Sequence, residues 1–120
     1  MKYLCLIYGN EKEMDVRREG DNRVMLEEYF TFTSDIKRNG KYLAGEALQA
    51  TATATTVRVR SGKLVTTDGP FAETKEQLGG FYMIDAADLN EAIQIASRIP
   101  GARTGCVEVR PVVVFANAPA

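Results

Sequence analysis

The sequence predicts an α+β fold in which two amphipathic helices cover one face of a mainly antiparallel sheet. Three observations lead to this prediction. Strand patterns and helix patterns alternate along the chain, two of the strand patterns are joined by a short turn, and both helix patterns carry apolar residues three and four positions apart. At 120 residues the chain fits one domain spanning residues 1–120, which should bury about two thirds of the surface that its unfolded form exposes.

The amino-terminal segment predicts one central strand followed by a loop. Lys2–Tyr8 is apolar at odd and even positions alike, and apolar side chains on both faces are typical of a strand inside a covered sheet. Gly9–Gly20 is polar and charged without a sustained period, which indicates a loop, although Glu11–Arg18 is able to hold a helical turn.

The next segment predicts an amphipathic helix over Val24–Arg38. Asp21 or Asn22 can cap its amino terminus, and its acidic residues come early and its basic residues late, as the helix dipole favours. Asn39 and Gly40 supply the left-handed conformation that ends a helix.

A strand and a hairpin follow this helix. Tyr42–Leu48 is a strand pattern that a glycine interrupts. Ala50–Thr56 is rich in threonine and alanine and predicts an extended connection. Thr55–Arg60 alternates apolar and polar residues, and the two residues after it turn the chain into Lys63–Thr67. These two segments therefore predict a hairpin with one exposed face.

The following segments predict a strand and a second helix. Phe81–Asp85 has the composition of a strand. Asp88 and Glu91 have the spacing of a capping box and precede an apolar stripe that runs to Ile99. Pro100 then ends the helix.

Two strand patterns, Cys106–Arg110 and Val112–Phe115, close the chain and are separated by Pro111, which cannot donate to a strand ladder. The complete order of elements is that of a ferredoxin-like α+β sandwich with an inserted β-hairpin. The second face of its sheet is too apolar to remain in water, because Lys2–Tyr8 has apolar side chains pointing both ways. We therefore predict a homodimer in which a second copy covers this face.

Charge and hydropathy argue against two classes of partner. With 15 basic and 16 acidic residues the net charge is -1, which provides no long-range field to attract nucleic acid. No apolar run approaches the roughly 20 residues needed to span a bilayer, and the amino terminus lacks a signal-peptide pattern. We expect a cytoplasmic protein that binds neither nucleic acid nor membranes.

Histidine is absent, which removes the usual neutral-pH base, the serine and cysteine triads, and most zinc and haem sites. Cys5 and Cys106 are far apart in strand patterns, so the sequence offers no paired metal ligands, and both are expected to be buried thiols. We therefore expect no metal and no cofactor.

Residues 68–85, DGPFAETKEQLGGFYMID, form the segment in which we expect the functional site. Asp68 begins a turn, where its carboxylate either bonds the turn's own backbone or serves in catalysis. Glu73 and Lys75 are able to act as a base and an electrostatic clamp, or to form an exposed ion pair. Gly79 and Gly80 let a ligand approach the backbone, but they lack the spacing of a phosphate-binding loop.

Glu46 is the preferred candidate for a catalytic base. It lies in an apolar strand pattern, and an inward carboxylate there would be desolvated and would hold a proton more tightly. The alternative is that Glu46 faces solvent or pairs with Arg58 on a neighbouring strand. In the functional interpretation, Arg58 instead binds the anionic group of a ligand.

Four motifs together resemble one known family. They are Gly45–Leu48, the threonine-rich run leading into Thr56–Val59, the sequence DGPFAETKEQLGG, and Val107–Pro111. The chain resembles YCII-related proteins of the DGPF type over nearly its whole length, with Gly9–Gly20 and the tail outside the pattern.

This resemblance implies a dimeric α/β barrel built from ferredoxin-like units. Some relatives are thought to use a histidine and aspartate pair in a cleft, with one branch linked to dehalogenation or elimination, but this chain has no histidine to supply that pair. Proteins of the DGPF type are also commonly encoded beside extracytoplasmic-function sigma factors, which implies a regulatory context.

Two functional hypotheses follow. The first is a small-molecule binding protein or enzyme with cofactor-independent, lyase-like or isomerase-like acid/base chemistry. It assigns proton transfer to three carboxylates and ligand binding to two cations and two glycines: Glu46, Asp68 and Glu73, with Arg58, Lys75, Gly79 and Gly80. The second is a noncatalytic interaction module associated with sigma-factor regulation.

Overall fold

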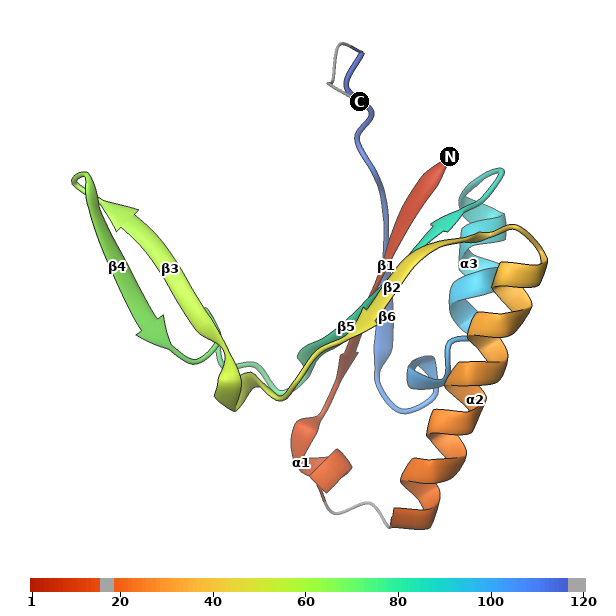
Figure 1. The fold of residues 1–120 in the computed structure, drawn as a ribbon, viewed down its shortest axis with the longest axis horizontal. Helices are drawn as coiled ribbons and strands as arrows, with labels where there is room; N and C mark the ends of the chain where they lie inside the picture. The colour runs from red at the N-terminus through yellow and green to blue at the C-terminus, as the bar shows by residue number, and fades with distance from the viewer. Residues whose placement is uncertain (16–18, 117–120) are drawn as a thin grey trace.

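A four-stranded antiparallel sheet forms the centre of the computed structural model, which describes residues 1–15 and 19–116 (Figure 1). Its strands are β1 (Lys2–Gly9), β2 (Tyr42–Ala47), β5 (Gln77–Asp85) and β6 (Cys106–Pro111), in the spatial order β2-β5-β1-β6. Among these four strands, the second and third along the chain pair with each other, and the first lies between the third and the fourth. This order confirms the ferredoxin-like prediction.

Two helices pack on one face of this sheet (Figure 1). They are α2 (Glu19–Arg38) and α3 (Leu89–Ser97), and a one-turn helix α1 (Glu11–Asp15) follows β1. The core lies between the helices and the sheet, and it contains alternate residues of β1 and β5 with the apolar stripes of the helices: Tyr3, Cys5, Phe32, Ile36, Tyr82, Ile84, Ala86, Ala92, Ile95, Ala96 and Ile99. None of the described helices is long and apolar enough to cross a membrane.

The capping prediction for α3 is confirmed. Asp88 accepts a hydrogen bond from the Glu91 backbone N–H at 2.9 Å, and Glu91 in turn accepts from the Ala87 N–H at 3.0 Å. Lys41 donates to the same Glu91 carboxylate at 2.9 Å, and this contact lowers the pKa of Glu91.

The predicted hairpin is present as β3 (Thr55–Arg60) and β4 (Lys63–Asp68), which pair only with each other and project away from the sheet (Figure 1). Ser61 and Gly62 both have positive φ angles, 51° and 75°, as a type I′ hairpin turn requires. Contrary to the prediction, the apolar side chains of Val57 and Val59 are also exposed, because no other element packs on this hairpin within the described residues.

Two predicted boundaries in the first half of the chain are wrong. The helix begins at Glu19 rather than at Val24, so the proposed caps lie inside it. The helical turn allowed within Glu11–Arg18 is present as α1, and the last three residues of that range lie outside the described residues. Within Ala50–Thr56, Thr51–Thr53 forms a 3-10 turn, η1, in place of a fully extended connection. The helix ends as predicted, with Gly40 at a φ of 72°.

Two predictions in the second half also need correction. The strand β5 begins at Gln77, so Gly79 and Gly80 lie within a strand rather than in a loop before it. Val112–Phe115 forms no strand, because among the described residues only the Val112 N–H of this segment bonds to the sheet, to the Lys2 carbonyl at 3.0 Å. The three residues after Val112 are exposed.

The two cysteines differ from each other. Cys5 is fully buried, as predicted, and this burial raises the pKa of its thiol to about 11. Cys106 is exposed, contrary to the prediction, because it lies on the face of β6 that no helix covers.

The sheet face opposite the helices carries apolar side chains in its centre. Since Tyr3 and Cys5 point toward the helices, Leu4 and Leu6 point to the other side. Cross-strand pairing places Phe81 beside Leu6 and Met83 beside Leu4 on this open face. Within the described residues, no helix covers it (Figure 1).

Gly80 is required for the close approach of β5 to β2, whereas its neighbour Gly79 is not. A Cβ atom at Gly80 would lie 2.8 Å from the Glu46 carbonyl oxygen, but one at Gly79 would meet nothing closer than 4.0 Å. We therefore expect Gly80→Ala to lower the free energy of unfolding by about 1–3 kcal/mol. Gly79→Ala, the matched control, should change it by less than about 1 kcal/mol. Urea unfolding measures both, and equal losses would contradict this role for Gly80.

Candidate functional site

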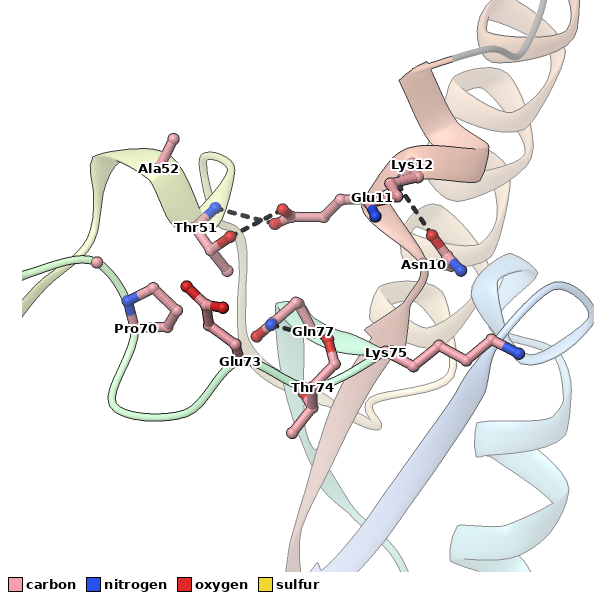
Figure 2. Close-up of a pocket in the computed structure, with 11 residues that line it drawn as sticks. Asn10, Glu11, Lys12, Thr51, Ala52, Pro70, Glu73, Thr74, Lys75 and Gln77 are labelled. Carbon is pink, nitrogen blue, oxygen red and sulfur yellow. Dashed lines mark hydrogen bonds between the residues drawn. The ribbon is translucent and has the colours of Figure 1, made fainter.

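A polar pocket lies beside the segment DGPF, and we call it the DGPF pocket (Figure 2). Its volume is about 650 Å³, which lies in the range of small-molecule sites. Three segments form its walls: the start of α1, the η1 turn, and the chain from the DGPF segment to the start of β5. The lining residues are Asn10, Glu11, Lys12, Thr51, Ala52, Gly69, Pro70, Glu73, Thr74, Lys75 and Gln77.

The base of the hairpin holds the DGPF turn in place. Gly69 has a φ of 100°, a conformation that favours glycine. Its N–H donates to the Ala54 carbonyl at 2.7 Å, and its carbonyl accepts from Thr56 Oγ1 at 2.8 Å. The turn is thereby fixed to the residues just before and at the start of β3, and Pro70 is directed into the wall of the pocket.

The opposite wall is held by Glu11 and Thr51, which are 40 positions apart in the sequence. One carboxylate oxygen of Glu11 accepts from the Thr51 N–H at 2.9 Å, and the other accepts from Thr51 Oγ1 at 2.8 Å. Asn10 caps the same short helix by accepting from the Lys12 and Glu13 N–H groups. These hydrogen bonds hold α1 and the η1 turn together, and both oxygens of the Glu11 carboxylate already accept a hydrogen bond.

Glu73 is the pocket carboxylate without a partner among the described residues. Its side chain points toward the wall formed by Thr51, and within the described residues it makes neither a hydrogen bond nor an ion pair (Figure 2). Lys75 also lines the pocket, but its side chain runs away from Glu73, so the two do not form the predicted clamp (Figure 2). The chain between Glu73 and β5 is held by two hydrogen bonds. The Thr74 hydroxyl donates to the Glu76 carbonyl, and the Gln77 amide donates to the Thr74 carbonyl.

A second, more apolar cleft of about 640 Å³ adjoins this pocket, and we call it the helix cleft. It runs between α2, β2 and β5, and it shares Asn10, Glu11 and Gln77 with the DGPF pocket. Its lining residues include Met25, Leu26, Tyr29, Phe30, Thr33, Gly45, Glu46, Leu48, Gly79, Gly80, Tyr82 and Gly101.

Tyr82 connects the helix cleft to the core. Its ring packs edge-on against Phe32 and Tyr42, and its hydroxyl lies 2.7 Å from Thr33 Oγ1. Thr33 donates its only hydroxyl proton to the Tyr29 carbonyl, so Tyr82 must be the donor in its bond with Thr33. Burial raises the pKa of Tyr82, which keeps this phenol protonated.

The structure divides the seven predicted site residues into three groups. Glu73 and Lys75 line the DGPF pocket, and Glu46, Gly79 and Gly80 line the helix cleft. Asp68 and Arg58 lie on the hairpin and line neither space.

Two expectations about these residues are corrected. Glu46 is exposed, as the solvent-facing alternative predicts, rather than inward, because it pairs with Phe81 across β2 and β5 on the open face. It does not pair with Arg58, since β3 belongs to a different sheet from β2.

The sequence interpretation missed Glu11 and Thr51. Glu11 lies where the sequence predicts a loop or a helical turn, and Thr51 lies in the connecting run; neither belongs to a recognisable local motif. Their pairing depends on how the chain returns after β2, and a single sequence carries no signal for it. Groups of three or more potential metal-ligating side chains are absent from the described part of the chain.

The fold and the two adjoining spaces define a ferredoxin-like α+β domain with an inserted hairpin and a candidate ligand site. Residues 1–116 match the YCII-related domain, and the chain belongs to this family. An uncharacterized protein of Rhizobium meliloti (strain 1021) is 39% identical over 122 aligned positions, which cover 96% of this chain and 94% of that protein.

The hydrogen bonds between Glu11 and Thr51 predict that two threonines of the η1 turn contribute differently to stability. Thr51→Val keeps the side-chain shape but removes the hydroxyl that reaches Glu11, so we expect a loss of about 1 kcal/mol in the free energy of unfolding. Thr53→Val removes only a local bond to the Ala50 carbonyl and should cost less than about 0.5 kcal/mol. Urea denaturation of both variants tests this, and a larger loss for Thr53→Val would refute it.

Proposed function

We propose that this YCII-related protein, of the DGPF type, binds a small molecule in the DGPF pocket and transfers a proton without a cofactor. Glu73 is the acid/base group in this proposal. The observation that carries it is the contrast between two carboxylates of one pocket: both oxygens of Glu11 accept hydrogen bonds from Thr51, whereas Glu73 has no protein partner within the described residues.

This contrast suits acid/base chemistry for a physical reason. An ionised carboxylate accepts hydrogen bonds, and one that already accepts a hydrogen bond from the protein on each oxygen has less capacity left for a substrate proton. Glu73 keeps that capacity and faces a space large enough for a ligand. The rigid wall opposite supports it, because a fixed surface can hold a substrate C–H or O–H against the carboxylate. The reaction class in this proposal is lyase-like or isomerase-like.

A metabolite screen by thermal shift tests the binding step. A ligand present at 100 times its Kd should stabilise the native protein by about 2.7 kcal/mol. We expect Glu73→Gln to lose the effect of the hit compounds, while Glu76→Gln keeps it, because Glu76 is an exposed neighbour that does not line the pocket.

For a hit compound, proton exchange with deuterated water measured by NMR tests the chemistry. Exchange should slow at least about 100-fold in Glu73→Gln. Undiminished exchange and binding in that variant would exclude Glu73 from both roles.

A homodimer is the second part of the proposal. The open sheet face supports it, because Leu4, Leu6, Phe81 and Met83 form an apolar centre there. Charged residues flank this centre on both edge strands, with Glu46 on β2 and Glu108 and Arg110 on β6. A polar rim around an apolar centre is the usual composition of a protein interface. Two copies packed through this face would form the dimeric α/β barrel that the resemblance implies.

Light scattering on the purified protein tests this part. We expect a species of twice the chain mass that becomes monomeric in Leu6→Glu, because a charge in the apolar centre would be buried without a partner. Asn90→Glu is the control, since Asn90 is exposed on α3 at the opposite side of the sheet, and it should leave the dimer intact. A monomeric native protein would refute the homodimer.

One observation favours the alternative function, a noncatalytic interaction module linked to sigma-factor regulation. The projecting hairpin exposes Val57, Val59 and Leu64, which is unusual for a segment that serves only as a loop. A metabolite screen without any hit would favour the interaction module over the small-molecule site.

A further inference from the structure

The helix cleft has an apolar rim that the fold does not require for its own packing. Leu26 and Phe30 on α2 and Leu48 after β2 all line the cleft, yet all three are exposed, Phe30 to 63%. The buried side of α2 uses Phe32 and Ile36 instead. Placing large apolar side chains against water is unfavourable, and their gathering around one concave space indicates a site for an apolar group.

The polar groups deeper in the cleft are already satisfied by one another. Tyr29 accepts from the Gly101 N–H at 3.0 Å, and Tyr82 donates to Thr33, whose own proton goes to the Tyr29 carbonyl. At the far end, the Lys37 ammonium lies 4.7 Å above the centre of the Tyr42 ring. A ligand between these groups therefore contacts mainly carbon atoms. An apolar ligand can enter without breaking the hydrogen bonds that these side chains make with one another.

The end of the cleft that joins the DGPF pocket has the opposite character. Glu11 belongs to both spaces, Glu13 lines the cleft, and Glu73 faces the pocket from the other side. Two lysines, Lys12 and Lys75, also line the pocket, but the Lys75 side chain runs away from Glu73, and Glu73 has no protein partner within the described residues (Figure 2). Carboxylates accept hydrogen bonds and attract positive charge, so this end suits a group that donates protons and carries a positive charge.

We infer that the ligand is an amphipathic cation, with an ammonium head in the DGPF pocket beside Glu73 and an apolar body in the helix cleft under Leu26 and Phe30. This inference rests on the proposed function, because it takes the DGPF pocket as the site of the polar head. The continuity of the two spaces through Asn10, Glu11 and Gln77 lets one molecule occupy both.

Three linear compounds test the inference, with binding followed by chemical-shift changes in NMR spectra of the full chain. The probes are n-octylamine, n-octanoate and n-butylamine at neutral pH, below micelle-forming concentrations. We expect octylamine to bind about tenfold more tightly than octanoate, because carboxylates attract one head and repel the other. Octylamine should also bind at least about tenfold more tightly than butylamine, since each buried methylene contributes to affinity.

Two variants separate the head from the body. Glu73→Gln should reduce the preference for the amine over the carboxylate and leave the effect of chain length. Phe30→Ser should reduce the effect of chain length and leave the preference for the amine. The matched controls are Glu76→Gln and Phe71→Ser, because Glu76 and Phe71 are exposed and line neither space, and both should behave as the native protein.

The possible failures are distinguishable. Octanoate binding as tightly as octylamine, with the chain-length effect sensitive to Phe30→Ser, would overturn the cationic head. If Glu73-dependent metabolites bind but octylamine binds no more tightly than butylamine, the inference is overturned while the proposed function stands. If Phe30→Ser weakens octylamine and Glu73→Gln changes no ligand at all, the inference and the proposed function are both wrong.

Discussion

The close approach of β2 to β5 is the constraint on which the candidate site depends. At Gly80 the β2 backbone lies where a side chain would otherwise be, and at Gly45 the Tyr82 ring takes the equivalent place, 2.8 Å from a Cβ position. These contacts set the position of Tyr82, and its bond to Thr33 then fixes the distance between α2 and the sheet. The helix cleft is the space that remains between α2 and this part of the sheet, and both Gly45 and Gly80 line it.

The sheet has two apolar faces, but the described helices cover only one of them. The covered face and the open face therefore suit different partners. On the helix side, the unfilled space is concave and small enough for a small molecule, whereas on the open side a broad row of apolar side chains has the composition of a protein contact. Glu46 lies at the boundary, because it lines the cleft and also pairs across the strands with Phe81 of the open face.

Features set by neighbouring residues could be predicted from the sequence, and those set by distant ones could not. The cap at Asp88 and the left-handed Gly40 depend on a few residues and were found. Val112–Phe115 has strand composition, but a strand also needs an edge to pair with, and the described part of the chain provides only one hydrogen bond to the sheet there. The partner of Glu11 is 40 positions away, and no local pattern indicates it.

The same reasoning explains why the sequence favours Glu46 as the catalytic base, whereas our proposal assigns that role to Glu73. In the sequence, Glu46 stands in an apolar run and Glu73 in a charged one, so Glu46 alone looked desolvated. The structure places Glu46 at an edge strand, where β2 has no further neighbour, while the DGPF turn carries Glu73 over the pocket. Burial along a strand depends on which strands flank it, and whether an exposed loop residue faces a pocket depends on what lies opposite the loop. Since Tyr82 belongs to both core and cleft, ligand contacts are separable from stability only at exposed positions such as Phe30 and Glu73.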